Sequence, residues 1–395
     1  MTVSSWLDLP HVPNPPLRGA TEADVVIIGA GLCGAGAALA LSAAGVRVVL
    51  LEGGQLAGSA TGRNAGFILQ GTAERYSRAA TVYGRERTAR VHALTLENHA
   101  RIASVIEEHQ IEAYYRRGGS LQLASSKEEE RELEESAAML NADGFEAVLL
   151  TDRLPEIYRA AGFSVGVLLP ADGELHPVRF VRGALAVAAS RGVALHEGSP
   201  VTALDAGASG DVRVATPEGE VRASVALVCT NARAGELLPW YADKVDPVRG
   251  QMLATAPAPR LFDLPVYADH GYDYWRQDEA GRVVLGGWRN LDPGAEVGTS
   301  DVLHEGIQSK MEAFIRRFPA LAEVPITHRW SGTMGFSRDG LPIVGPAPGA
   351  PGALAAVGFT GHGFGFAWLA GEALAGVVLE GAHPMVAELS PRRFL

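Results

Sequence analysis

Cysteine and lysine are both scarce in this sequence of 395 residues. Its 2 cysteines, Cys33 and Cys229, each lie in an apolar stretch, which is typical of buried, reduced thiols rather than of a disulfide. The sequence therefore argues against a small disulfide-rich secreted protein, and it predicts a cytoplasmic location. Lysine is limited to Lys127, Lys244 and Lys310 among 34 basic residues, a bias from which no function follows.

Concentrated positive charge and a long hydrophobic run are lacking as well. The net charge is −11 and the basic residues are scattered, so we expect no nucleic-acid partner. Residues 1–23 have neither a basic nor an apolar block, which predicts an extended, Pro-rich arm instead of a signal peptide. The longest uncharged stretch, 341–371, contains eight Gly and four Pro, so we expect no transmembrane segment.

What the sequence does contain is a strand, turn, helix and strand pattern near the N-terminus. Gly29, Gly31 and Gly34 follow an apolar run and open a helix, and Glu52 ends the next strand. In a dinucleotide-binding unit the first glycine permits the turn, the second lets the backbone approach a pyrophosphate, and the third allows close helix–strand packing. The helix N-terminus attracts the phosphates, and the acid accepts hydrogen bonds from a ribose. We therefore expect a bound dinucleotide, and the alternative is a glycine turn selected only for packing.

A dense run of glycines, "GSATGRNAGFILQG" at 58–71, follows the second strand. Ordinary turns need only one or two glycines, so this backbone is predicted to lie flat against a bound group. An NAD dehydrogenase would leave this segment and the Gly-rich turn at 358–365 unexplained, and no second dinucleotide fingerprint is found. FAD accounts for both segments, and we expect FAD as the cofactor.

Together these motifs resemble the D-amino-acid oxidase superfamily of flavoproteins, and within it the gamma-glutamylputrescine oxidase-like and glycine or sarcosine oxidase-like amine oxidases. The matching segments include "GSATGRNAGF", "GELHP", "DPVRGQML", "GRVVLGGWR", "SRDGLPIVGP" and "GFTGHGFGFAWLAGEAL". The resemblance implies an α/β fold, with a Rossmann-like (GR2-type) FAD-binding domain and a second, antiparallel-sheet α+β substrate domain. It implies an N-terminal arm at 1–23, a discontinuous FAD-binding domain at 24–84, 170–235 and 326–395, and a substrate domain at 85–169 and 236–325.

The resemblance also implies which residues touch the cofactor. In the family, the segment matching "GSATGRNAGF" lies along the isoalloxazine, "VTAL" at 201–204 lies beside the adenine, and the turn before the last helix points N–H groups at the pyrimidine end of the flavin. A positive helix terminus there stabilises the anionic reduced ring. The expected contacts are Gly29, Gly31, Gly34, Glu52, Gly58, Ser59, Arg63, Asn64, Ala65, Gly66, Val201, Gly332, Gly361, His362, Gly363 and Phe364.

Three positions depart from the sarcosine-oxidase branch. Gly332 stands where that branch has the cysteine that links FAD covalently, so we expect non-covalent FAD. Gly365 replaces a lysine that pairs with the substrate carboxylate, which favours an amine, or an acid anchored elsewhere, over a small α-amino acid. Val284 replaces a lysine used for the reaction with oxygen, with Arg282 and Arg289 nearby, and this leaves oxidase and dehydrogenase both open.

The substrate pocket has four candidate residues, each of which has a structural role as its alternative. They are His362, Tyr272, Tyr274 and Arg249. The two tyrosines are expected on one face of a strand in the wall above the flavin, with Trp275 on the other face, although aromatics at strand spacing are often core. His176, which precedes a proline, is more typical of a structural position. No His, Cys, Asp and Glu grouping has metal-ligand spacing, so we expect no metal.

The implied reaction is oxidation of the C–N bond of a primary or secondary amine or amino acid. Hydride passes from the α-carbon to flavin N5, water hydrolyses the imine, and O2 reoxidises the flavin to give H2O2. The expected partners are thus a small-molecule substrate and O2 or another electron acceptor. The alternatives are a dehydrogenase that passes electrons to a quinone or carrier, and a non-catalytic FAD-binding subunit of a complex.

Overall fold

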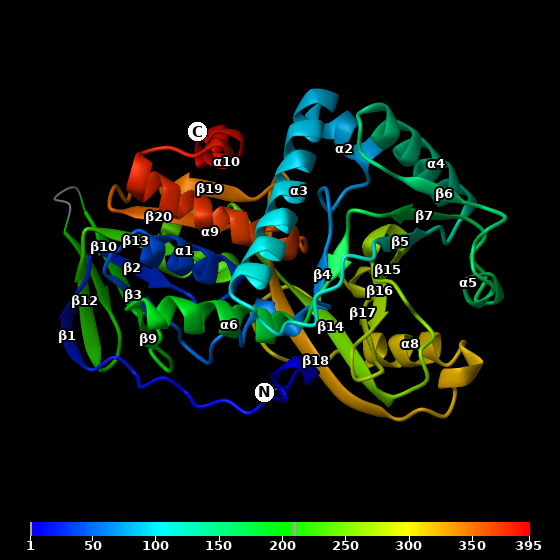
Figure 1. Ribbon diagram of the computed structural model, residues 1–395, viewed down its shortest axis with the longest axis horizontal. Coiled ribbons are helices and arrows are strands. Elements are labelled where there is room, and N and C mark those ends of the chain that lie inside the picture. The colour runs from blue at the N-terminus through cyan, green and yellow to red at the C-terminus, as the bar shows by residue number, and fades with distance from the viewer. Residues whose placement is uncertain (1, 208–210) are drawn as a thin grey trace.

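Two large β-sheets, built differently, lie on opposite sides of the molecule in the computed structural model, which describes residues 2–207 and 211–395 (Figure 1). The first sheet has six strands in the order β19-β20-β13-β2-β3-β9, all parallel except β19. Its strands are β2 (Val25–Ile28), β3 (Val48–Leu51), β9 (Ala194–His196), β13 (Val225–Val228), β19 (Ile343–Pro346) and β20 (Ala353–Val357). The central strands are uninterrupted runs of buried aliphatic residues, because layers cover both faces of a parallel sheet.

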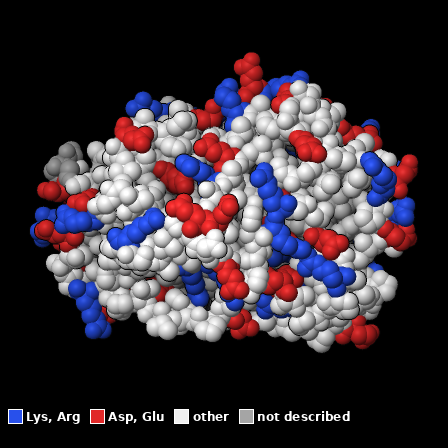
Figure 2. All heavy atoms as spheres, in the orientation of Figure 1, with Lys and Arg blue, Asp and Glu red and all other residues white. Residues whose placement is uncertain are grey.

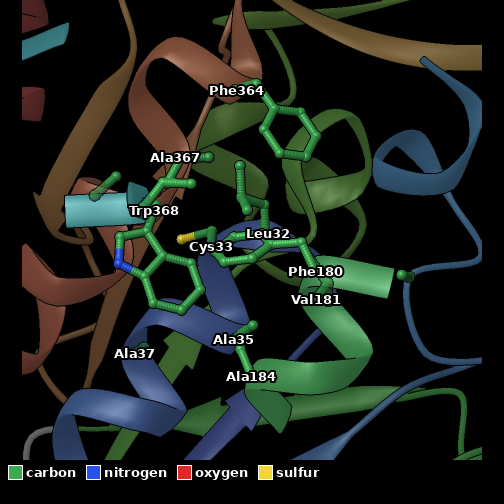
Figure 3. Close-up of a cluster of buried hydrophobic side chains, with 14 of the residues drawn as sticks. Leu32, Cys33, Ala35, Ala37, Phe180, Val181, Ala184, Phe364, Ala367 and Trp368 are labelled. Atoms are coloured by element: carbon green, nitrogen blue, oxygen red, sulfur yellow. The ribbon is translucent and has the colours of Figure 1, made fainter. Parts of the chain in front are cut away.

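Three helices form the layer on one face of this sheet. They are α1 (Leu32–Ala43), α6 (Pro177–Ser190) and α9 (Gly363–Glu380). Small residues let α1 and α9 approach closely: a Cβ at Gly36 would lie 2.6 Å from the Trp368 carbonyl oxygen. Leu32 at the start of α1 and Phe364 at the start of α9 point into one apolar cluster with Phe180 of α6 (Figure 3). The first turns of the two helices therefore lie together.

A four-stranded sheet in the order β1-β12-β11-β10 covers the other face of the first sheet. Its strands are β1 (Gly19–Glu22), β10 (Ala203–Ala206), β11 (Val212–Ala215) and β12 (Gly219–Ala223). Strands β11 and β12 form an antiparallel hairpin around a Pro-Glu-Gly turn at 217–219. Val26 and Ile28 of β2 pack against Val214 and Val221 of this layer.

The second large sheet has eight strands in the order β18-β14-β17-β16-β15-β5-β7-β6. Its strands are β5 (Ser120–Leu123), β6 (Val148–Leu150), β7 (Gly166–Leu169), β14 (Val245–Pro257), β15 (Val266–Ala268), β16 (Asp273–Gln277), β17 (Arg282–Gly287) and β18 (Ile326–Ser337). Every pair is antiparallel except β15 and β5, which are parallel. The expected α/β fold with a second, mainly antiparallel sheet is confirmed.

The remaining helices pack against the second sheet, at the boundary between the sheets or, for α7 and α10, against the first sheet and its layers. They are α2 (Tyr76–Tyr83), α3 (Arg85–Glu108), α4 (Lys127–Ala142), α5 (Glu156–Ala160), α7 (Ala234–Leu237), α8 (Glu305–Ile315) and α10 (Pro384–Leu389). Helix α3 packs against α9, and β18 pairs along β14 in the second sheet. The boundaries expected at residues 85 and 326 therefore do not follow the layers.

Two further segments have a distinct local structure. The stretch 265–290 holds three strands, β15, β16 and β17, because the backbone turns at 269–271 with positive φ at three successive residues. The N-terminal arm is extended only in part: it begins with a 3₁₀ turn, Ser5–Leu7, and later forms β1. Trp6 of that turn is fully buried, and its Nε1 donates a hydrogen bond to the Asn64 carbonyl at 2.6 Å.

Surface charge and helix hydrophobicity bear on the expected partners. Acidic and basic side chains are intermixed over the face drawn in Figure 2. One helix of the described residues, α9, is long and apolar enough to cross a membrane, and 61% of it is buried inside the protein. A core helix of this fold has the same properties, so α9 is weak evidence for a membrane span.

Candidate active site

The glycine fingerprint lies where three parallel strands, β2, β3 and β13, end side by side. Gly29 has φ +105°, and a side chain there would come 2.8 Å from the Cys229 carbonyl oxygen. A side chain at Gly34 would overlap the Gly29 carbonyl oxygen. Both positions therefore require glycine, and the carboxyl ends of parallel strands are where open α/β sheets bind their ligands.

The glycine-dense segment folds back onto this fingerprint turn. Thr61, in the 3₁₀ turn Ala60–Arg63, accepts a hydrogen bond at 3.0 Å from the Leu32 backbone N–H at the start of α1. A Cβ at Gly31 would lie 3.0 Å from the same hydroxyl oxygen. The fingerprint turn and the glycine-dense segment, both expected to bind FAD, therefore form one continuous surface.

Glu52 lies at the end of β3, beside the turn. Its Oε2 accepts a hydrogen bond from the Ala30 N–H at 2.9 Å, and its Oε1 accepts one from the Gly54 N–H at 2.8 Å. Burial raises the pKa of Glu52, and these two backbone hydrogen bonds oppose that shift. The carboxylate is therefore held in a fixed orientation at the end of the strand.

The side chains of Arg63 and Asn64 are bound to other parts of the protein. Arg63 donates to the Ser331 carbonyl oxygen at 2.8 Å and to the Thr2 carbonyl oxygen at 2.9 Å. The Asn64 amide donates to Thr61 and accepts from the Gly66 N–H at 2.7 Å. These hydrogen bonds of the two side chains tie the glycine-dense segment to itself, to the N-terminal arm and to β18.

The other residues expected to contact the cofactor differ in how they pack against their neighbours. A Cβ at Gly58 would lie 2.6 Å from Gln55 Cγ, and one at Gly332 would lie 2.9 Å from Arg63 Cβ. Gly66 has φ +74° and packs against the Leu175 carbonyl. Ser59 is exposed, Ala65 is buried, and Val201 packs partly buried against the four-stranded layer.

The turn before α9 carries the remaining expected contacts. Gly361 has φ +78°, His362 is the residue before the helix, and Gly363 begins it. The Phe364 carbonyl accepts a hydrogen bond from the Asn98 side chain of α3 at 2.7 Å, which anchors this turn. Burial lowers the pKa of His362 to about 4, and Arg289 contributes in the same direction. His362 is therefore neutral near pH 7.

A partly open cavity of about 70 Å³ lies between this turn and the second sheet. His362 lines it, and the Tyr267 ring of β15 lies 6.3 Å from the His362 ring. Tyr267 stacks on Tyr274 of β16 at 5.5 Å, and Phe67 contacts both rings edge-on. The cavity therefore meets the α9 turn on one side and an aromatic wall on the other.

Of the three aromatics expected to alternate here, Tyr274 and Trp275 of β16 lie on opposite faces. Tyr274 packs toward the α9 side and donates to the Met252 sulfur at 3.3 Å, whereas Trp275 is buried on the opposite side with Phe262 and Phe318. Tyr272 lies just before the strand, and its ring is covered by the Arg289 guanidinium at 4.4 Å.

The contacts of the Arg249 side chain do not support the role in the substrate pocket that was expected for it. Its guanidinium lies 3.2 Å from Glu296 and donates to both the carbonyl and the hydroxyl of Ser300 and to the Ala295 carbonyl. Arg249 and Glu296 are 5% and 0% exposed. This residue is a buried link between β14 and the segment 295–300, a partnership that the sequence could not reveal because the partner is distant along the chain.

Two polar residues near the cavity were not among the sequence candidates. Arg289 has no acidic partner among the described residues and lies over Tyr272 and Phe336. Gln70 lines the cavity, and its Nε2 has no hydrogen-bond partner in the described part of the chain. Gln70 belongs to the glycine-dense segment, but nothing in its sequence context indicated an unpaired amide.

His176 has the structural position that its sequence context favoured. Its Nδ1 accepts a hydrogen bond from the Arg179 N–H at 3.3 Å and so caps α6, and its ring packs against Trp6. One group, Glu129, Asp269 and His270, brings three possible metal ligands close together. Glu129 already binds Arg75 and accepts from the Ser125 and His270 N–H groups, so its oxygens are occupied.

Comparisons with known proteins agree with this arrangement. Residues 24–377 match the DAO family, described as FAD dependent oxidoreductase. The probable oxidoreductase OrdL of Rhizobium meliloti is 28% identical over 95% of this chain and 88% of its own length. The gamma-glutamylputrescine oxidoreductase of Escherichia coli is 26% identical over 92% of this chain and 85% of its own length.

Solved structures show the same fold. Glycine oxidase from Geobacillus kaustophilus superposes with a TM-score of 0.79 at 21% identity, over 93% of this chain and 98% of that chain. L-proline dehydrogenase from P. horikoshii also superposes with a TM-score of 0.79 at 21% identity, over 97% of this chain and 98% of that chain. Because the family match spans most of the sequence, the chain belongs to the DAO family of FAD-dependent oxidoreductases, and FAD is its cofactor.

Proposed function

We propose that the protein oxidises the C–N bond of an amine or amino acid at the cavity between the turn before α9 and the second sheet. One observation carries the proposal: the turn that begins α9 and the aromatic wall of the second sheet line the same cavity through His362 and Tyr267. The names of two relatives, gamma-glutamylputrescine oxidoreductase and glycine oxidase, support an amine or amino-acid substrate.

The residues present fit FAD. Glycine is required at Gly29 and Gly34, and the resulting turn leads into α1, whose first N–H groups suit the pyrophosphate. Glu52 would accept the ribose hydroxyls, and Val201 would lie beside the adenine. The backbone of 58–66 and the α9 turn, Gly361–Phe364, would hold the flavin ring. Among the described residues no group pairs with the buried His362 Nδ1 at that turn, and a bound cofactor or substrate would satisfy this polar atom.

When bound, FAD would supply the two-electron oxidation of the carbon next to nitrogen, and its reoxidation by O2 would release H2O2. The chain prepares the substrate for this step. Removal of the amine from water in the cavity would disfavour its ammonium form, lower its pKa and promote loss of its proton. Neutral His362 presents an unpaired ring nitrogen to the cavity and adds no positive charge there. Water then hydrolyses the imine product.

A dehydrogenase is the second candidate, and Val284 favours it. Val284 is fully buried in β17 within the apolar core. No lysine among the described residues lines the cavity, so the basic residue that the sarcosine-oxidase branch uses for oxygen has no counterpart there. Such an enzyme would reduce a quinone or a carrier protein in place of O2.

Arg289 offers a binding group for the carboxylate of an amino acid, a group that a simple amine lacks. Its guanidinium is half-buried, has no acidic partner among the described residues, and influences His362 and Tyr267 electrostatically. A carboxylate bound there would replace the missing lysine at Gly365. We therefore include amino acids in the substrate class alongside amines.

Peroxide release from the purified holoenzyme tests the proposal across a panel of amines and amino acids. Anaerobic bleaching of the flavin absorbance by the same panel reports reduction without oxygen. Bleaching with peroxide establishes the oxidase, and bleaching without peroxide establishes the dehydrogenase. A flavin that no member of a broad panel bleaches would overturn the proposal in favour of a non-catalytic FAD-binding subunit.

A further inference from the structure

The first turn of α9 has little of its own to hold it in place. Its residues include Gly363 and Gly365, and glycine is a poor helix former. His362, the residue before the helix, makes no capping hydrogen bond through its side chain. The N–H groups of a first turn also have no partners inside the helix. The conformation of this turn therefore depends on contacts from outside α9.

Asn98 of α3 makes such a contact with its side-chain amide, which is fully buried. Its Nδ2 donates to the Phe364 carbonyl at 2.7 Å, and its Oδ1 accepts from the Leu369 N–H at 3.0 Å. A backbone carbonyl only accepts and a backbone N–H only donates, so these two partners fix which way the amide faces. One side chain thus joins the first turn of α9 to the second.

The two hydrogen bonds from Asn98 add to those of the helix itself. In an α-helix the carbonyl of residue 364 accepts from the N–H of residue 368, and the N–H of residue 369 donates to the carbonyl of residue 365. Both backbone groups therefore have a partner available within α9. An apolar side chain could fill the same space without burying an amide. The amide is thus better explained by where it holds the turn than by a need to satisfy the helix.

The turn is held from one side and faces the active-site cavity on the other. A Cβ at Gly365 would lie 2.6 Å from the Leu69 carbonyl oxygen and 3.7 Å from Thr95 Cγ2, so the glycine-dense segment and α3 both pack against it. His362 lines the cavity, and its Nδ1 has no partner among the described residues. The helix terminus is therefore available to a bound group while the rest of the turn is fixed.

A fixed helix terminus acts differently on the two redox states of a flavin. The N-terminus of a helix carries a partial positive charge of about half a unit, and its effect falls off within the first turn. Two-electron reduction gives the flavin ring a negative charge that the oxidised ring lacks. A turn held in place therefore stabilises the reduced ring more than the oxidised ring, and a turn that is free to move loses part of that effect.

We propose that Asn98 is a positioning residue that, by holding the first turn of α9 in place, raises the reduction potential of the bound FAD. Its action on the cofactor passes through the helix terminus. This inference rests on the proposed function, because that proposal places the flavin ring at the α9 turn.

Asn98→Leu tests this role. It removes both hydrogen bonds and keeps a side chain branched at the same carbon, so the contact between α3 and α9 is retained. Asn141→Leu is the matched control, because the Asn141 amide also bonds to backbone groups, the Ala137 and Ala147 carbonyls, but in α4. Asn98→Ala removes the same hydrogen bonds without adding volume, and it takes the place of Asn98→Leu if that variant does not fold.

The reduction potential is measured on the FAD-loaded proteins with dyes of known potential, which needs no substrate. We expect Asn98→Leu to bind reduced FAD about tenfold more weakly relative to oxidised FAD, which lowers a two-electron potential by about 30 mV. The potential of Asn141→Leu should equal that of wild type. Urea unfolding in parallel reports the loss of stability, which both variants should show because each loses hydrogen bonds.

The outcomes separate this inference from the proposed function. An unchanged or higher potential in the Asn98 variants, or an equal fall in Asn141→Leu, would overturn the inference. Loss of FAD from both Asn98 variants while Asn141→Leu stays fully loaded would assign Asn98 to cofactor binding and would also overturn it. A fall confined to the Asn98 variants supports it. If that fall is seen but no amine or amino acid reduces the flavin, the proposed function fails while the role of Asn98 stands.

Discussion

Glu52 Oε2 accepts a hydrogen bond from the Ala30 N–H at 2.9 Å, which ties the end of β3 to the fingerprint turn that follows β2. We expect Glu52→Ala to weaken FAD binding at least about tenfold, because hydrogen bonds to a charged group contribute about 1.5–3 kcal/mol each. Fluorescence of released FAD during dilution measures the dissociation constant. Glu218→Ala, at an exposed acid, is the control. Unchanged affinity in Glu52→Ala would remove this residue from the cofactor site.

Gly365 cannot carry a side chain without displacing the chain beside it. A Cβ there would lie 2.6 Å from the Leu69 carbonyl oxygen. We expect Gly365→Ala to destabilise the protein by about 1–3 kcal/mol through overpacking, although alanine contributes up to about 1 kcal/mol of helix propensity. The shift in melting temperature measures the effect. Gly363→Ala is the control, because its Cβ would meet nothing closer than 3.9 Å. Equal melting temperatures for both variants would contradict the packing argument.

Arg276 connects the second sheet to the glycine-dense segment. It is 2% exposed, lies 2.9 Å from Glu174, and donates to the Leu175 and Gly66 carbonyls at 2.8 and 3.2 Å. The guanidinium Nε–H does not point at the Glu174 oxygen, so that contact is an ion pair more than a directed hydrogen bond.

We expect Arg276→Leu to lower the free energy of unfolding by about 3–5 kcal/mol, because it leaves a buried carboxylate with less compensation. FAD occupancy should fall with it, since Gly66 loses its support. Urea unfolding and the ratio of flavin to protein absorbance measure the two effects. Arg18→Leu, at a pair in which both side chains are mostly exposed, should change stability by less than about 1 kcal/mol. If Arg276→Leu also lowered the free energy of unfolding by less than about 1 kcal/mol, the buried Arg276–Glu174 pair would contribute little to stability.

The local part of the site could be predicted from sequence, and the rest could not. The fingerprint glycines and Glu52 act through neighbours close in the chain, so their spacing was sufficient. Strand alternation likewise separated Tyr274 from Trp275. Arg249 was misjudged because Glu296 neutralises it from a distant loop. Gln70 was missed because its unpaired nitrogen depends on where α3 places His92.

The structure keeps cysteine away from the position where the sarcosine-oxidase branch attaches FAD. Gly332 packs on Arg63, and the two cysteine sulfurs lie 3.4 Å from each other, with Cys33 in α1 and Cys229 after β13. The hydrogen bond with the Cys229 thiol and burial raise the pKa of Cys33, which disfavours the reactive thiolate. We expect acid precipitation to release all yellow colour into the supernatant. Flavin fluorescence on a denaturing gel would contradict non-covalent binding.

His99 provides a test of how burial sets the pH dependence of stability. It is 2% exposed, Tyr115 Oη lies 2.9 Å from its Nε2, and burial lowers its pKa to about 4. An unfolded histidine titrates near 6.5, so between these values the unfolded chain takes up a proton that the folded protein does not. The contribution of His99 to stability is therefore lost as the pH falls from about 6.5 to 4. We therefore expect the free energy of unfolding of His99→Gln to rise relative to that of wild type by about 1.4 kcal/mol for each unit by which the pH falls across that window. Urea unfolding of both proteins from pH 7 downward measures the difference, and parallel curves would show that the folded imidazole can take up the proton.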